Sequence, residues 1–238
     1  MMNIVITGTS KGIGYQIAKL FAEDENNTVI AIARSENLLK ELKNECIRQN
    51  LKSKLKIIVF DIEDPKNVKN NLKNEIFKYI QSIDILINNA GYLKHSAFID
   101  TEIDEIIKIF NINLISHSVL IQDLIPMLKE SKQSHVINIS SMGGFQGSSK
   151  FPGLSFYSSS KAALANLTEC LAEEFKSDNI KFNCLALGAV NTEMLKLAFP
   201  DYDAPLSAHE MANFIYDFAI NGSRYFNGKI LPVNLSTP

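Results

Sequence analysis

The sequence predicts an α/β protein in which a doubly wound, three-layer sandwich surrounds a seven-stranded parallel sheet. Short apolar segments alternate with amphipathic segments along the whole length of the 238 residues. The apolar segments are apolar throughout rather than at every second position, which is typical of strands buried on both faces. A glycine-rich turn joins the first apolar segment to the first amphipathic one. Together these observations indicate a fold of the Rossmann type.

The strands are expected where apolar runs of four to seven residues are bounded by polar or glycine-containing segments. They are residues 3–7, 28–33, 55–60, 84–87, 135–139, 181–187 and 229–233. We find no linker, internal repeat or low-complexity tract between them, so residues 1–238 are predicted to form one domain.

The helices are expected between the strands, where apolar residues recur at helical spacing. Ser35 is placed as the N-cap of one helix, and Pro65 as the first residue of the next. The predicted helices are 15–23, 35–49, 65–80, 102–130, 157–177 and 207–220. The long one is expected to bend near 111–113 or at Pro126. Residues 140–156 are predicted to be a loop rich in glycine and serine, and 190–210 a segment that covers a substrate.

Composition argues against several classes of protein. A formal charge of −2 gives no electrostatic reason to expect a nucleic-acid partner or an anionic membrane. No run of eighteen apolar residues is present, and a strand pattern begins at once after Met1, so neither a membrane span nor a signal peptide is expected.

The cysteines and histidines give no sign of a disulfide framework or a metal site. Three widely spaced cysteines suit a reducing compartment, and we expect Cys46, Cys170 and Cys184 all to be buried. The four histidines have no convincing partners, which favours ordinary surface or core positions and no metal. The sequence therefore predicts a cytoplasmic protein.

The first strand-turn-helix junction is the natural place for a dinucleotide phosphate. Gly8, Gly12 and Gly14 would let the backbone approach the phosphate, and the helix N-terminus offers free amides and a positive dipole end. The alternative is a tight turn whose small residues serve helix-sheet packing alone. Its position on the first strand favours the nucleotide.

The residues at the end of the second strand indicate which dinucleotide cofactor is expected to bind. An acidic residue there would bind the ribose hydroxyls of NAD(H), but the chain has Ala33 and Arg34 at this point. A guanidinium suits the 2′-phosphate of NADP(H), and Lys11 adds a second cation in the glycine turn. The alternative is that both are solvated surface charges. The pattern favours NADP(H) over NAD(H).

Tyr157 and Lys161 lie one helical turn apart in a predicted helix. The ammonium should favour the phenolate and lower the phenol's pKa, so that Tyr157 could exchange a proton near neutral pH. Alone, such a pair is more often two solvated neighbours.

Five motifs in order give the pair its context. They are the glycine turn of residues 7–14, Asn88-Asn89-Ala90-Gly91, Asn113-Leu114, Asn138-Ile139-Ser140-Ser141 and Tyr157-x-x-x-Lys161. Over essentially its whole length, the chain resembles a short-chain dehydrogenase/reductase of the compact single-domain branch.

The resemblance implies the catalytic roles. Tyr157 matches the general acid and base, and Lys161 the lysine that holds the nicotinamide ribose. Ser141 matches the serine that hydrogen-bonds the substrate carbonyl, with Ser140 as its rival. Asn113 matches the asparagine of a water-linked proton relay, with Asn111 as its rival.

The resemblance also implies a set of cofactor-binding residues. They are Gly8, Ser10, Lys11, Gly12, Ile13, Gly14, Arg34, Asp61, Ile62, Asn89, Ala90, Gly91, Tyr157, Lys161, Gly188, Val190 and Thr192.

The chain departs from the family pattern at two places beside the expected site. Tyr157 follows Ser141 by sixteen positions, which is longer than the family's usual spacing. We expect the extra residues, within 146–156, to bulge over the site and shape the substrate mouth without moving the serine. Leu187 replaces the proline that usually precedes the glycine after the sixth strand, which loosens that turn.

The expected function is reduction of a ketone or aldehyde carbonyl to an alcohol, or the reverse, with NADP(H). A 3-oxoacyl thioester reductase acting on an acyl-carrier protein is the alternative, although Lys150 is the one cation near the loop and a free small molecule is slightly favoured. A non-catalytic NADP-binding sensor or interaction module is the alternative of another class, and a nucleotide-sugar epimerase is disfavoured. A homodimer or homotetramer is expected.

Overall fold

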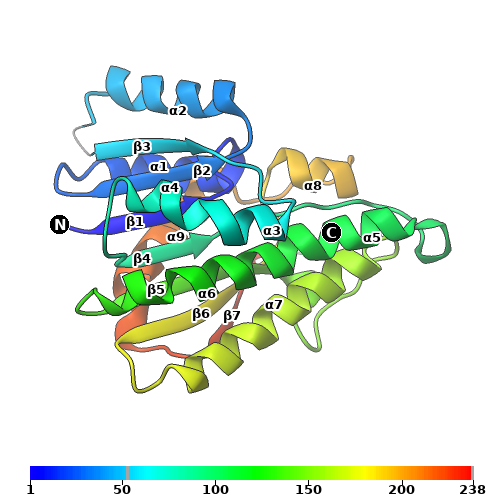
Figure 1. Ribbon diagram of the computed structural model, residues 1–238. Coiled ribbons are helices and arrows are strands. Elements are labelled where there is room, and N and C mark those ends of the chain that lie inside the picture. The colour runs from blue at the N-terminus through cyan, green and yellow to red at the C-terminus, as the bar shows by residue number, and fades with distance from the viewer. Residues whose placement is uncertain (52–53, 237–238) are drawn as a thin grey trace.

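The computed structural model describes residues 1–51 and 54–236. Within these residues, seven parallel strands form one sheet in the order β3-β2-β1-β4-β5-β6-β7 (Figure 1). The strands are β1 (Asn3–Thr7), β2 (Thr28–Ala33), β3 (Lys54–Val59), β4 (Ile85–Asn88), β5 (Ser134–Ser141), β6 (Ile180–Leu187) and β7 (Lys229–Val233). The order reverses between β1 and β4, which places a ligand crevice at the carboxyl ends of these strands. The predicted fold class is confirmed.

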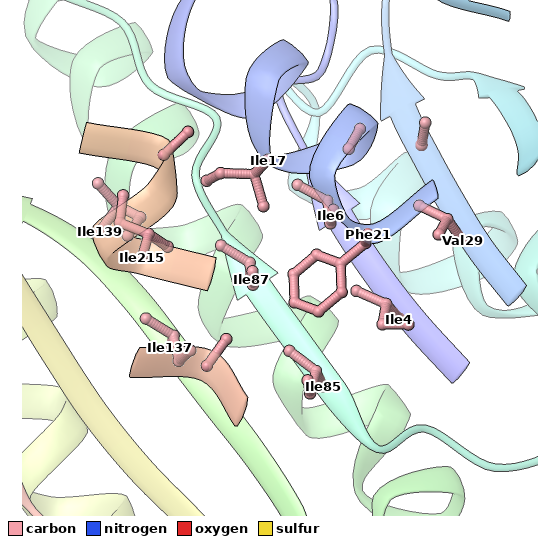
Figure 2. Close-up of a cluster of buried hydrophobic side chains, with 14 of the residues drawn as sticks. Ile4, Ile6, Ile17, Phe21, Val29, Ile85, Ile87, Ile137, Ile139 and Ile215 are labelled. Atoms are coloured by element: carbon pink, nitrogen blue, oxygen red, sulfur yellow. The ribbon is translucent and has the colours of Figure 1, made fainter. Parts of the chain in front are cut away.

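Successive residues of a strand point to opposite faces of the sheet, so a strand that is apolar throughout makes both faces apolar. Helices cover both faces for this reason. Ile4 and Ile6 of β1 pack with Phe21 on one face, and Val5 packs into a second core on the other. The first core is drawn in Figure 2, where Phe21 lies among isoleucines of three strands. The helices over this core are α1 (Gly12–Ala22), α2 (Glu36–Arg48) and α9 (Ala208–Asn221). Those over the other are α4 (Lys73–Phe77), α6 (Ser116–Lys129) and α7 (Ser155–Glu174).

Two of the predicted helices are interrupted by a π-helical turn. In the first, η1 (Val68–Leu72) separates α3 (Pro65–Asn67) from α4. In the second, η3 (Asn111–Ile115) separates α5 (Ile103–Phe110) from α6, at one of the two predicted bends. Pro126, the other predicted bend, lies inside α6 without ending it. π-turns of this kind re-aim side chains and are frequent at functional sites.

Several boundaries differ from the prediction near the crevice. β5 extends through Ser141, so this serine ends a strand rather than opening a loop. α1 begins at Gly12, directly within the glycine turn. A short helix, α8 (Glu193–Ala198), forms in the segment predicted to cover the substrate, and the Thr192 hydroxyl caps it by accepting a 3.3 Å hydrogen bond from the Leu195 amide.

The cysteine prediction is correct at two positions and wrong at the third. Cys46 and Cys184 are buried, whereas Cys170 is exposed. Cys170 lies on the face of α7 away from the sheet, because the buried face of that helix is carried by Leu164, Ala165 and Thr168. No helix among residues 1–51 and 54–236 combines the length and the apolarity that a bilayer crossing requires.

Candidate active site

A cleft of about 370 Å³ opens at the carboxyl ends of the strands, between the sheet and α8. It brings together residues from the ends of β1, β2, β4, β5 and β6 with the first turn of α7. The sequence-predicted residues that line it are Gly8, Ser10, Lys11, Gly12, Ile13, Gly14, Arg34, Asp61, Ile62, Asn89, Ala90, Gly91, Ser141, Tyr157, Lys161, Gly188, Val190 and Thr192. Asn113 is the one predicted site residue that does not line the cleft and lies behind its wall.

The glycine turn is held tightly against the end of β4. A Cβ atom at Gly8 would lie 2.7 Å from the Ala90 Cα, and Gly8 has a φ of +75°. A Cβ atom at Gly14 would lie 2.3 Å from the Asn89 side-chain nitrogen, which donates hydrogen bonds to the carbonyls of Thr7 and Gly8 at 3.0 and 3.1 Å. The absence of side chains therefore leaves backbone at the N-terminus of α1 open to the cleft.

Charged side chains gather at the end of the cleft near β2 and β3. Lys11 and Arg34 are both exposed, and Asp61 follows β3. Lys11 forms an ion pair with Glu193 in the first turn of α8. No carboxylate takes the place of Ala33 or Arg34 at the end of β2. This end of the cleft thus combines two cations with the open amides of the glycine turn.

The Tyr157 phenol lies in the cleft, in contact with the Ser141 hydroxyl. Burial raises the pKa of Tyr157 above its usual value of 10.0, and the hydrogen bond with Ser141 opposes that rise. The predicted lowering by Lys161 is therefore wrong for this structure. The reason is that burial dominates, and the lysine ammonium is directed to a backbone carbonyl instead of the phenol.

Lys161 is almost fully buried beneath the cleft. Its ammonium donates a 2.8 Å hydrogen bond to the Ile139 carbonyl. Burial lowers the pKa of Lys161 from 10.5 to about 8. A Cβ atom at Gly91 would lie 3.4 Å from the Lys161 Nζ and 3.5 Å from the Asn113 Oδ1, so both polar groups flank this glycine.

Asn113 uses its whole side-chain amide within the protein. Its Oδ1 accepts from the Tyr92 amide at 2.8 Å, and its Nδ2 donates to the Tyr92 carbonyl at 2.9 Å and to the Ser160 hydroxyl at 3.0 Å. Ser160 in turn donates to the Tyr157 carbonyl at 2.7 Å. The π-turn η3 thus connects the wall of the cleft to the start of α7.

Ser140 and Asn111, the alternatives to Ser141 and Asn113, have different surroundings. The Ser140 hydroxyl donates to the Lys161 carbonyl at 2.8 Å and is nearly buried, whereas Ser141 contacts the Tyr157 phenol. Asn113 is fully buried and hydrogen-bonded to Tyr92, whereas Asn111 is half-buried. The geometry therefore favours Ser141 and Asn113 as the members of the site.

Part of the cleft wall is formed by residues that were not predicted from the sequence. Tyr92, Leu93 and Met142 line it beside residues that were predicted, and Phe151 and Leu154 come from the lengthened loop. Large apolar side chains in a loop otherwise rich in glycine and serine were the available signal, because such residues need a surface to bury against.

His117 was also missed as a neighbour of the site. Its Nε2 lies 2.8 Å from the Ala90 carbonyl, and burial lowers its pKa to about 4, so the imidazole is neutral. The ring supports the cleft wall from behind, consistent with the predicted core position.

Comparison with known proteins identifies the family. The family model described as short chain dehydrogenase matches residues 2–203. The chain belongs to the short-chain dehydrogenase family. This membership makes it an oxidoreductase of that family.

Relatives and solved structures agree with the assignment. The 3-oxoacyl-(acyl-carrier-protein) reductase FabG of Chlamydia trachomatis is 30% identical over 241 residues, covering 97% of this chain and 94% of the relative. The L-sorbose reductase of Gluconobacter frateurii, solved with NADPH and L-sorbose, superposes with a TM-score of 0.85 at 24% identity, covering 98% and 95% of the two chains. A short-chain dehydrogenase of Burkholderia cenocepacia in complex with NADP also gives 0.85 at 24% identity, covering 97% and 95%. At that identity the two structures support the fold.

Proposed function

We propose that this short-chain dehydrogenase interconverts a ketone or aldehyde and its alcohol with NADP(H), using Tyr157 as the general acid and base. The observation that carries the proposal is that Tyr157 and Ser141 line the same cleft as the open glycine turn. Two hydroxyl donors placed together suit a carbonyl oxygen on which negative charge develops.

The residues of the cleft fit a dinucleotide. The close approach at Gly8 and Gly14 forms a cradle that a Cβ atom would fill, and α1 begins there. Lys11 and Arg34 would hold the 2′-phosphate of NADP(H), and Asp61 with Ile62 would contact the adenine. Asn89, Ala90, Gly91, Gly188, Val190 and Thr192 would line the remainder. The bound cofactor would supply or accept the hydride.

The protein's own residues would handle the proton and the carbonyl. Tyr157 donates its phenolic proton to the substrate oxygen, and Ser141 donates a hydrogen bond to the same atom. Lys161 would hold the nicotinamide ribose with its buried ammonium. Asn113 completes the route by which the proton is replaced.

Reduction of a 3-oxoacyl thioester on an acyl-carrier protein is the second candidate, and the FabG relative is the observation that favours it. An acidic carrier would need a basic surface near the cleft mouth. Lys150 donates instead to the carbonyls of Phe145 and Ser148, at 2.8 and 3.2 Å, and so caps its own loop. This use of Lys150 favours a free small molecule.

We also propose that the chain is one cytoplasmic domain, residues 1–238, that assembles as a homodimer or homotetramer. Cys46, Cys170 and Cys184 are free thiols, which suits a reducing compartment. Ile103 and Ile107 lie one turn apart on α5 and are 64% and 49% exposed, an apolar stripe that a second copy could cover.

A carbonyl panel followed by NADPH and NADH absorbance tests the proposal, with Tyr157→Phe beside the parent. We expect NADPH to be oxidised by the parent and turnover by the variant to fall at least about 100-fold, with NADPH binding retained. Tyr225→Phe, at a 77% exposed position outside the cleft, is the matched control. A Tyr157 variant as active as the parent would remove Tyr157 from its role. Binding of NADPH without turnover of any carbonyl would favour the non-catalytic module.

A further inference from the structure

The wall of the cleft beyond Tyr157 is apolar and carries no free charge among the described lining residues. The charged side chains that line the cleft have other positions: Lys11 pairs with Glu193, Arg34 and Asp61 follow β2 and β3, and Lys161 binds a backbone carbonyl. The remaining wall near Tyr157 and α8 is neutral. Its side chains are Tyr92, Leu93, Met142, Phe151, Leu154, Met194, Leu195, Ala198 and Phe199.

The lengthened loop, residues 146–156, is fixed in place rather than left to adapt. The Ser96 amide donates to the Gly153 carbonyl at 3.0 Å, and Phe156 stacks on Phe98 with ring centroids 5.2 Å apart. Gly153 has a φ of +78°, and a Cβ atom there would lie 2.6 Å from the His95 ring. These contacts hold Leu154, three residues before Tyr157, nearly buried against the cleft.

An aromatic pair connects this loop to the segment over the cleft. The rings of Phe151 in the loop and Phe199 at the end of α8 meet edge to face, with centroids 5.1 Å apart. The Lys196 ammonium of α8 is directed away, to Asp203 at 2.6 Å and to the Tyr202 carbonyl at 3.1 Å. We call Phe151 and Phe199 the aromatic bridge. An edge-to-face aromatic pair stabilises the packing beyond what burial of its apolar surface alone contributes.

We propose that the aromatic bridge makes this site selective for uncharged ketones that carry an aryl group or an alkyl chain longer than methyl beside the carbonyl, with Phe151 as a specificity-determining residue. The inference rests on the proposed carbonyl reduction and assigns its substrate class. An apolar substituent would gain free energy in proportion to the surface that it buries against this wall. A carboxylate or phosphate would lose its water without meeting a cation.

Polyhydroxylated substrates are disfavoured for a related reason. The apolar wall would leave their hydroxyls without hydrogen-bond partners. The free-energy penalty of these unpaired hydroxyls exceeds the favourable free energy of contact with the wall. Tyr92, which also lines the cleft, does not change this, because its hydroxyl is already bonded to Glu105 at 3.0 Å. This cleft therefore differs from one suited to sugars, which would offer hydrogen-bond partners to several hydroxyls.

Three carbonyl compounds with NADPH test the inference: acetophenone, its para-carboxylate, and butane-2,3-dione, which is small and reactive enough to need few pocket contacts. We expect kcat/KM for acetophenone to exceed that for the carboxylate by at least about 100-fold. Phe151→Ala should lower kcat/KM for acetophenone by about tenfold while that for the dione stays within about twofold, and Phe151→Leu should be intermediate. Phe214→Ala, at a 41% exposed aromatic of α9 outside the cleft, should change neither.

The outcomes separate the inference from the function on which it rests. Reduction of the dione together with equal use of acetophenone and its carboxylate would overturn the substrate class alone. An unchanged ratio in Phe151→Ala, with dione activity showing that the variant is folded, would remove Phe151 from its role. No NADPH oxidation with any of the three would overturn the carbonyl reduction itself, and the substrate class with it.

Discussion

Lys161 is a cation held in an apolar place by a single backbone carbonyl. Its pKa of about 8 means that burial, not attraction to a neighbouring acid, dominates its titration. Such a lysine costs stability wherever it is charged, and its retention is explained by the proposed role beside Tyr157 rather than by packing. The buried charge of Lys161 therefore lowers the free energy of unfolding, and this cost can be measured.

The first prediction concerns the pH dependence of stability at Lys161. Below pH 8 the lysine is charged in both the folded and unfolded states, so the folded state carries the full cost of burial. Between pH 8 and 10.5 only the unfolded state binds the proton, so the free energy of unfolding should rise with pH. Relative to Lys161→Met, the parent should gain up to about 3 kcal/mol over this window. Urea unfolding of both proteins at pH 7.5, 9 and 10 measures the gain, and a difference independent of pH would contradict it.

The second prediction concerns cofactor preference at Lys11. Its ammonium is exposed and paired with Glu193, so its contribution to a phosphate should be modest. Lys11→Ala should weaken NADPH binding by about tenfold, equivalent to about 1.4 kcal/mol, and leave NADH binding within about twofold. Fluorescence titration with both cofactors measures this. Lys40→Ala, at a similarly exposed ion-paired lysine of α2, is the control. Equal losses for NADPH and NADH would show that Lys11 does not contact the 2′-phosphate.

At the scale of elements, the glycine turn joins α1 to β1 and β4 through two different constraints. Gly12 has a φ of +62°, but the atom nearest a Cβ there would be 3.7 Å away, so its constraint is conformational. Gly14 has ordinary helical backbone, but a Cβ there would meet the Gly8 carbonyl oxygen at 2.4 Å. One position needs glycine for its torsion and the other for close approach.

The third prediction follows from that difference. Gly12→Ala should cost about 1 kcal/mol, because only the backbone torsion is strained. Gly14→Ala should cost about 3 kcal/mol or more, because α1 must move away from β4 and the Asn89 hydrogen bonds must break. Urea unfolding of the two variants beside the parent gives the order. A Gly12 variant less stable than the Gly14 variant would contradict this account.

Strands β1, β2 and β4 were predictable because burial on both faces makes each one a continuous apolar run. The edge strands β3 and β7 have exposed positions within them. The N-cap Ser35 and Pro65 in the first turn of its helix were also predictable. The π-turn η3 was not, since it depends on Asn113 reaching Tyr92 across the cleft wall, a contact that local sequence does not encode. The sequence offered two positions for a bend, and the π-turn lies at the first of them, while Pro126 lies inside α6.

The proposed site residues come from motifs far apart in the sequence, and the structure brings all of them except the buried Asn113 to one cleft. The electrostatics were not predictable from spacing, because a lysine one turn from Tyr157 in sequence directs its ammonium to the Ile139 carbonyl instead. The contribution of Phe151 was also hidden, since its contact with Phe199 joins segments far apart in the chain. Spacing along a helix predicts which side chains are neighbours, but their pKa values depend on burial, which the spacing does not show.

At the scale of the molecule, two surfaces are distinct: the cleft, and an exposed apolar stripe on α5. The carboxyl ends of the strands carry the cleft, while α5 carries a stripe of exposed isoleucines to one side. Ile103 and Ile107 lie four residues apart on α5 and are 64% and 49% exposed, and Ile99 in the preceding 3-10 turn η2 (Phe98–Asp100) is 89% exposed. In Figure 1, α5 leads into α6, and α7 runs alongside. Apolar side chains in such a row are costly in water and suit a self-complementary contact about a twofold axis.

The fourth prediction therefore concerns assembly. Sedimentation velocity at micromolar concentration should give the mass of a dimer or tetramer for the parent. Ile103→Glu combined with Ile107→Glu should shift it towards a smaller species, because two carboxylates per copy would be desolvated at the shared surface. Ile47→Glu, at a 64% exposed isoleucine on α2, should leave the mass unchanged. A parent that sediments as a monomer would rule out the assembly. An α5 variant with the parent's mass would place the contact elsewhere on the molecule.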